Sequence, residues 1–96
     1  MTKEKSRAEA TANSLNREQY ISIRQQMQDH THVSDLFEWL WECEHITSME
    51  AFRYLHNTRV SATVFTLRHD YGVPVQTKMI TKKGHTYGVY WLDKEV

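Results

Sequence analysis

The sequence predicts a small α+β domain in which four helices precede a two-stranded β-hairpin. Apolar residues recur at helical spacing in four segments between residues 15 and 71. Two runs rich in β-branched and aromatic residues, 73–81 and 86–92, flank the turn sequence KKGH. The 96 residues are 40% hydrophobic and contain one proline, which is enough for one modest core. We therefore expect a single folded domain.

The domain boundaries follow from where the apolar periodicity begins. Residues 1–14 show none and mix charges of both signs, which is typical of a disordered tail. Residues 15–32 are expected to form an N-terminal helix and a linker, and residues 33–96 the main domain.

The N-terminal helix is predicted from Leu15 to Gln28. Tyr20, Ile23 and Met27 lie on one of its faces, and Asn16 is available to cap its first turn. This apolar face needs a cover, which could be the rest of the same chain or a second copy in a homodimer.

A second helix is predicted from Asp35 to about Glu44, with Ser34 as its N-cap. Leu36, Leu40 and Cys43 define its inner face, so Cys43 is interpreted as a buried thiol. A single cysteine excludes an internal disulfide and a cysteine-based zinc site.

The same helix carries much aromatic surface. Phe37 and Trp39 flank its inner face and Trp41 lies further round, while its acidic residues would face solvent. A small core does not cover so much aromatic area. The N-terminal helix, or a second copy of the chain, is the expected cover.

A third helix is predicted within the segment TSMEAFRYL. Thr47 and Glu50 have the spacing of a capping box, in which each side chain bonds the other residue's backbone amide. Ala51, Phe52 and Leu55 would form its inner face, and the sequence HNT ends it after little more than two turns.

A fourth helix follows almost at once, with Thr58 as its expected N-cap. Four residues share its inner face: Val60, Val64, Leu67 and Tyr71. Gly72 and Pro74 would end the helix.

The C-terminal third predicts a hairpin that turns around Gly84. On one face of its first strand the alternating residues are Val73, Val75, Thr77 and Met79, and on one face of its second strand they are Tyr87, Val89 and Trp91.

The predicted elements have the layout of a winged helix-turn-helix. Two short helices are joined by a tight turn, a supporting helix precedes them, and a hairpin follows them. Two segments of the sequence also resemble a small helix-turn-helix family common in bacteriophages and prophages. They are ITSMEAFRYLHNTRVSATVFTLRHDYGVPVQTKMI and the later GHTYGVYWL. The matching residues, all within about 33–92, are Ile46, Thr47, Ser48, Glu50, Ala51, Thr58, Arg59, Ser61, Ala62, Leu67, Arg68, Gly72, Thr77, Tyr87, Tyr90 and Leu92. The resemblance implies a winged helix and, by association, a phage- or prophage-type regulator or accessory factor that binds DNA.

The fourth helix, about residues 59–71, would then be the recognition helix. Its outward residues are Arg59, Ala62, Phe65, Thr66 and His69, flanked by Ser61 and Arg68 on one side and by Thr63 and Asp70 on the other. Arg59 is suited to a bidentate hydrogen-bond contact with guanine, and the methyl groups of Ala62 and Thr66 are suited to contact with the methyl groups of thymine. Ser61, Thr63 and Arg68 suit phosphates. The turn of the hairpin adds Lys82, Lys83 and His85 as candidate DNA contacts, with Lys78 nearby.

A second class of function stays open, because an adaptor or anti-repressor could keep this fold and bind protein instead of DNA. Thr63 stands where the family pattern places an arginine, and Phe65 puts an aromatic ring on the outward face. The candidate interface residues for a protein partner or a homodimer are Trp39, Trp41, Phe65, Tyr20, Ile23 and Met27.

The charge distribution favours DNA only locally. The formal net charge is zero, yet residues 35–50 carry five acids and no Lys or Arg, whereas residues 58–96 carry six bases and three acids. A basic C-terminal third is suited to a phosphate backbone.

Other chemistry is not indicated. The six histidines lack zinc-like spacing, and there is neither a glycine-rich phosphate loop nor a nucleophile motif. No segment approaches the roughly 18 apolar residues of a membrane span. We expect no enzymatic activity, cofactor, metal, small-molecule substrate or membrane contact, and a cytoplasmic protein, in the host cytoplasm if phage-encoded.

Overall fold

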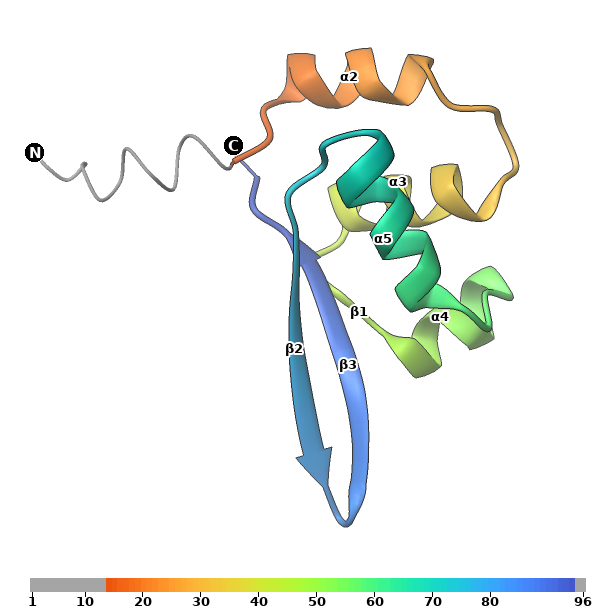
Figure 1. The fold of residues 1–96 in the computed structure, drawn as a ribbon, viewed down its shortest axis with the longest axis vertical. Coiled ribbons are helices and arrows are strands. Elements are labelled where there is room, and N and C mark those ends of the chain that lie inside the picture. Colours follow the sequence, from red (N-terminus) through yellow and green to blue (C-terminus); the bar gives the residue numbers. More distant parts are fainter. Residues whose placement is uncertain (1–13, 95–96) are drawn as a thin grey trace, which may run out of the picture.

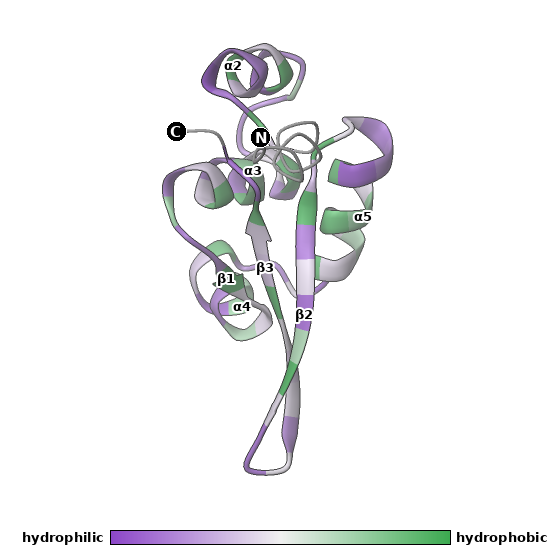
Figure 2. Cartoon of the chain, turned by 90° about the vertical axis from the view of Figure 1, so that its left-hand side faces the viewer, coloured by the Kyte–Doolittle hydropathy of each residue, from purple (hydrophilic) through white to green (hydrophobic). Residues whose placement is uncertain are grey.

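The computed structural model describes residues 14–94, so the predicted N-terminal tail lies outside the described residues except for Ser14. Four helices and a three-stranded antiparallel sheet confirm the α+β class (Figure 1). The elements in order are α2 (Arg17–Gln25), α3 (His32–Glu42), β1 (Ile46–Thr47), α4 (Ser48–Leu55), α5 (Val60–Asp70), β2 (Val75–Lys82) and β3 (His85–Leu92). Figure 2 shows the β2–β3 hairpin extending well beyond the helices, with hydrophilic residues at its turn.

The helix starts are set by side-chain caps. Asn16 caps α2 and Thr47 caps α4, as the sequence predicted, and the predicted capping box of Thr47 and Glu50 is present. Asn16 forms a further capping box with Gln19, which was not predicted from the sequence. The prediction for α3 was wrong: Thr31 is the N-cap, and Ser34 is the buried third residue that bonds back to the amide of Thr31. Serine is among the preferred N-cap residues, so the pattern alone placed the start of the helix too late.

The end of α3 also differs from the prediction. The helix stops at Glu42, and Cys43 follows it with an extended backbone. Because the chain has left the helical path, the thiol does not continue the inner face and is exposed rather than buried. The N-terminal helix is likewise shorter than expected and ends at Gln25.

The core lies between α3, α4, α5 and the helix-proximal part of the sheet. Its fully buried members include Leu36, Phe37, Leu40, Ile46 and Leu67. The inner face predicted for α5 is buried at three of its four residues, and Tyr71 is half-buried.

The hairpin forms in the predicted place. Lys83 and Gly84 both have positive φ, 53° and 80°, which a two-residue turn of the hairpin type requires. β3 also pairs with β1, with Ile46 opposite Tyr90, a third strand that the sequence did not predict because it contains only two residues.

The buried face of the hairpin differs from the alternation seen in the sequence. The buried residues of β3 are Gly88, Tyr90 and Leu92, whereas Tyr87, Val89 and Trp91 are half-buried on the other face. Aromatic residues occur on both faces of this strand, so alternation alone does not choose between them.

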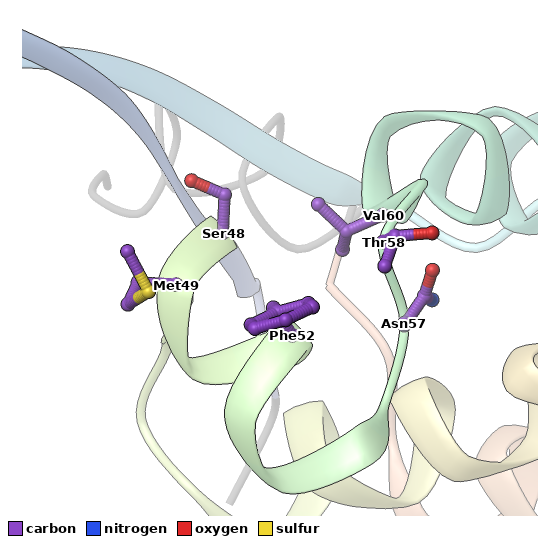
Figure 3. A pocket seen from close by; sticks show the side chains of 6 residues that line it. All are labelled: Ser48, Met49, Phe52, Asn57, Thr58 and Val60. Carbon is purple, nitrogen blue, oxygen red and sulfur yellow. The ribbon is translucent and has the colours of Figure 1, made fainter.

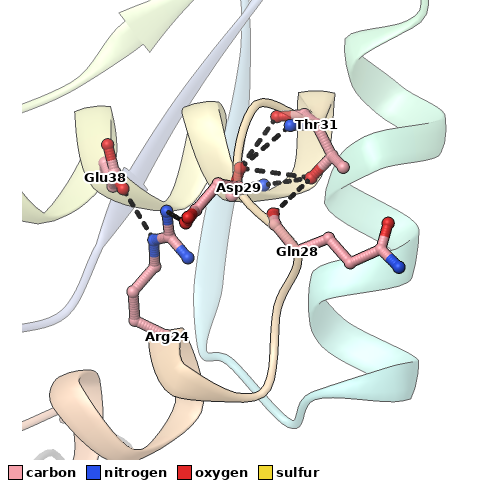
Figure 4. Close-up of polar contacts among 6 residues, drawn as sticks. Arg24, Gln28, Asp29, Thr31 and Glu38 are labelled. Carbon is pink, nitrogen blue, oxygen red and sulfur yellow. Dashed lines mark hydrogen bonds and ion pairs between the residues drawn. The ribbon is translucent and has the colours of Figure 1, made fainter.

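The face of α2 that the sequence left uncovered packs on the same chain. Tyr20 stacks on Trp41 at 4.6 Å between ring centroids and contacts Phe37 at 4.8 Å, and Met27 is buried. The guanidinium of Arg24 lies between Glu38 and Asp29, at 2.6 and 2.7 Å (Figure 4). α2 is therefore held to α3 by aromatic stacking and by the ion pair of Arg24 with Glu38, and the pair with Asp29 ties α2 to the segment that joins the two helices.

Candidate nucleic-acid interface

The turn between α4 and α5 is fixed by one buried amide. α4 ends at Leu55, its C-cap His56 has the left-handed conformation (φ 55°, ψ 31°), and the next residue, Asn57, is only 2% exposed. The Asn57 side chain donates to the Thr63 hydroxyl at 2.9 Å and accepts from the Arg59 amide at 2.9 Å. These bonds join the turn to α5 and so set the direction in which α5 leaves it.

Thr63 is consequently not on the outward face. It is 8% exposed, and its hydroxyl bonds to Asn57 and to the Arg59 carbonyl. Its prediction as a phosphate contact is corrected, because a threonine at that helix position satisfies the buried amide of the turn. Thr58 is also not the N-cap of α5; Arg59 occupies that position without a side-chain cap.

The other outward residues of α5 are accessible. Arg59, Ser61, Ala62, Phe65, Arg68 and His69 are exposed, and Thr66 is half-buried. The Phe65 ring is 59% exposed and packs against the His69 imidazole, with 4.0 Å between the ring centroids. α5 thus presents one continuous exposed face whose centre is aromatic.

Arg68 connects the helix to the sheet. Its guanidinium donates to the Val75 carbonyl at 2.9 Å and to the Thr77 hydroxyl at 2.7 Å. The predicted phosphate contact is therefore partly engaged within the protein, where it holds β2 against α5. This function of Arg68 could not be read from its position on the helix alone.

The predicted cations of the hairpin gather at its turn. Lys82 pairs with His85 across the last position of the ladder, Lys83 lies in the turn, and all three are exposed. Lys82 lies five residue steps along the strand from Thr77, which is beside α5, a distance of roughly 17 Å at 3.3 Å per residue. The structure therefore groups the predicted contacts into two places, the outer face of α5 and the tip of the hairpin.

A family model described as a winged helix-turn-helix domain matches residues 31–95. The chain belongs to this family. No curated protein and no solved structure matches the sequence. In this winged helix, α3 supports the helix-turn-helix formed by α4 and α5, and the β2–β3 hairpin is the wing. The match leaves α2 outside it.

The helix-turn-helix also contains a shallow hollow of about 430 Å³ that the sequence did not predict. It is lined by Ser48, Met49, Phe52, Asn57, Thr58 and Val60 (Figure 3). Phe52 was expected to face the core, but it is 54% exposed and projects between α4 and the start of α5. In a helix of only two turns the core takes Ala51 and part of Leu55, and Phe52 lies 100° further round.

The aromatic residues proposed for a protein interface are mostly engaged within the same chain. Trp41 is covered by Tyr20, and Trp39 stacks with Tyr54 at 5.7 Å while its indole donates to the His45 carbonyl. Beside Trp39 lies a groove lined by the acidic residues Asp35, Glu38 and Glu42. This part of the surface is acidic, unlike the tip of the wing.

Two further properties of residues 14–94 bear on the site. No helix there is long and apolar enough to cross a membrane. No three His, Cys, Asp or Glu side chains in that part of the chain are grouped so that they could hold a metal ion.

Proposed function

We propose that this protein binds double-stranded DNA sequence-specifically, with α5 in the major groove and the tip of the wing on the flanking backbone. The observation that carries the proposal is the exposed outer face of α5, which begins at Arg59 and is braced by Asn57 at one end and Arg68 at the other. A rigid helix with an open outer face is what a helix-turn-helix inserts into the major groove.

The start of α5 supports phosphate binding nearby. α2, α3 and α4 each begin with a capping box, whereas α5 begins without a side-chain cap. The amides of Arg59 and Ala62 have partners within the protein, so the attraction for a phosphate group at this end comes from the positive end of the helix dipole. Arg59 at the same end adds a full positive charge and a bidentate donor.

The geometry of the wing supports a second contact. Its cationic tip lies roughly 17 Å along the strand from Thr77, which exceeds the ~12 Å width of the major groove. Lys82, Lys83 and His85 would then meet phosphates or the neighbouring minor groove. We further propose, on the sequence resemblance, that the protein is a phage- or prophage-type transcription regulator or accessory factor.

Fluorescence anisotropy with labelled duplexes tests the proposal. A preferred site is first selected from a random duplex pool, and binding is then measured from 50 to 300 mM salt. Arg59→Ala should cost ~1–3 kcal/mol on the preferred site and relax specificity there. Lys82→Gln with Lys83→Gln should weaken binding to all duplexes similarly and reduce the salt slope by about two.

Arg17→Ala is the matched control, because Arg17 is an exposed arginine on α2, outside the family match. It should leave affinity unchanged. Wild-type affinity in the Arg59→Ala variant for every duplex would contradict the assignment of α5, and absence of binding at 50 mM salt would contradict DNA binding itself.

A protein-binding function is the second candidate, favoured by the exposed apolar side chains Met49, Phe52, Tyr54 and Phe65. An adaptor or anti-repressor of this kind would bind its partner at high salt.

A homodimer is a separate possibility, which sedimentation of the purified protein tests. It would need a surface other than the face of α2 that already packs on α3.

A further inference from the structure

The outer face of α5 lacks the side chains that usually read bases by paired hydrogen bonds. Its centre is formed by Ala62, Phe65, Thr66 and His69, and the helix contains no Asn, Gln, Lys or Glu. Bidentate readout of adenine uses Asn or Gln, and readout of guanine uses Arg or Lys. Arg59 at the N-terminal end is suited to this, but the middle of the face is not.

Phe65 is the largest group on this face and is held in place. Its ring is 59% exposed and rests on the imidazole of His69, one helical turn further along, with the planes tilted by 30°. An i, i+4 contact restricts the rotation of an exposed ring, so the cost of ordering it on binding falls. An exposed and oriented phenyl ring gains free energy when it meets an apolar surface.

The major groove offers one kind of apolar surface, the C5 methyl group of pyrimidines, which unmodified DNA carries only on thymine. The stripe from Ala62 to His69 rises about 10 Å along the helix, the length of three base-pair steps. Ala62 and the Thr66 methyl lie beside Phe65 on this stripe, within about 100° of arc. Three apolar groups at this spacing match thymines on neighbouring base pairs.

We propose that α5 selects its site mainly through thymine C5 methyl groups, with Phe65 as the principal contact. The inference rests on the proposed DNA-binding function and specifies the base that the middle of the helix reads. Arg59 would then set the register of the helix, and the methyl contacts would supply most of the discrimination along about three base pairs. Ala62 and Thr66 add smaller contacts of the same kind.

Replacement of thymine by deoxyuridine tests this directly, because it removes the methyl group and leaves the hydrogen-bonding edges unchanged. The selected duplex is synthesised with thymines exchanged singly and together, and anisotropy is measured at one salt concentration. Wild-type affinity should fall about fourfold for each contacted methyl, and at least tenfold when all are exchanged. Phe65→Ala should lose the effect at the thymine that Phe65 contacts and keep only the smaller differences that come from Ala62 and Thr66.

Phe52→Ala is the matched control. Phe52 is exposed to a similar extent, 54% against 59%, but it lies on α4. This variant should keep the full difference between thymine and uracil. Thermal unfolding of both variants checks that the fold is retained, as expected for exposed side chains.

The outcomes separate the inference from the function on which it rests. Equal wild-type affinity for the two duplexes, with salt-dependent binding intact, would overturn the thymine assignment and leave DNA binding standing. A third duplex carries 5-methylcytosine in place of cytosine. If affinity rose on this duplex but did not change when thymine was exchanged for deoxyuridine, the contacted methyl group would be that of 5-methylcytosine, and the thymine assignment would also fall. Binding to neither duplex at 50 mM salt would overturn both proposals.

Discussion

At the scale of single residues, the orientation of α5 depends on Asn57. The turn residue after the left-handed His56 is the buried Asn57. Its backbone N–H donates to the Ala51 carbonyl at 3.0 Å, and both polar atoms of its side chain have partners, in Thr63 and Arg59. A buried polar group is favourable only when it is paired in this way.

Asn57→Ala should lower the free energy of unfolding by about 2–3 kcal/mol, because it removes two bonds and leaves the Arg59 amide and the Thr63 hydroxyl without this partner. Urea denaturation measures the change. Asn16→Ala is the control, since it removes only the cap of α2 and should cost about 1 kcal/mol. An equal loss for the two variants would mean that Asn57 stabilises the protein no more than an ordinary helix cap and would contradict this prediction.

The candidate site was predictable where it depends on helical spacing. The exposure of Arg59, Ala62, Phe65 and His69 followed from the periodicity of the helix. Thr63 was misplaced because its burial depends on a hydrogen bond to a residue outside the helix, and periodicity carries no information on such partners. The bonds from Arg68 to β2 were unpredictable for the same reason.

At the scale of the elements, the hairpin shows how a strand can accommodate a large ring in the core. A Cβ built on Gly88 would lie 2.9 Å from the Tyr90 hydroxyl oxygen and 3.1 Å from the carbon that carries it. Tyr90 is 7% exposed, so its ring cannot easily move aside. Gly88 therefore makes room for Tyr90 on the buried face of β3.

Gly88→Ala should destabilise the domain by about 1–3 kcal/mol through overpacking. Urea denaturation is again the measurement. In a Tyr90→Phe background the hydroxyl is absent and the closest contact is removed, so the same substitution should cost less. The same cost in both backgrounds would show that contact with the Tyr90 hydroxyl is not the cause.

Prediction of the elements from sequence succeeded for the four helices and the hairpin, because each has a strong local signal such as the Thr47 capping box or the Gly84 turn. It failed for β1, which exists only through pairing with β3. It also failed for the start of α3, where two residues of one capping box can each be taken for the cap.

At the scale of the whole molecule, α2 packs on the winged helix although it lies outside the residues that the family model matches. Burial against Phe37 and Trp41 raises the pKa of the Tyr20 phenol above its ordinary value of 10.0, and Glu38 and Glu42 raise it further while Arg24 opposes them. The Arg24 pKa is also raised, by its hydrogen bonds to Asp29 and Glu38. The attachment of α2 is thus sensitive to alkaline pH through Tyr20.

The folded state holds the Tyr20 proton more tightly than the unfolded state. Its contribution to stability is present in full below pH 10 and is lost as pH rises through the raised pKa. Wild type should therefore lose stability above pH 10 more steeply than Tyr20→Phe, which keeps the ring. Urea denaturation between pH 8 and 11.5 measures this, and parallel curves for the two proteins would contradict it.

The distribution of charge across the molecule agrees with the proposed orientation on DNA. The acidic residues of α3 line a groove beside Trp39, whereas the exposed cations of residues 58–96 lie at the start of α5, near its end, and along the wing: Arg59, Arg68, Lys78, Lys82 and Lys83. A protein with zero net charge can bind a phosphate backbone through such a local basic surface.

The central claim is that α5 and the tip of the wing together form a DNA-binding surface. An amide NMR titration with a mixed-sequence duplex, at 50 mM and then 150 mM salt, tests it most directly. We predict shifts confined to residues 59–69 and 82–85 that fade as salt rises. An unchanged spectrum at 50 mM salt, or shifts confined to α3 around Trp39, would contradict the claim.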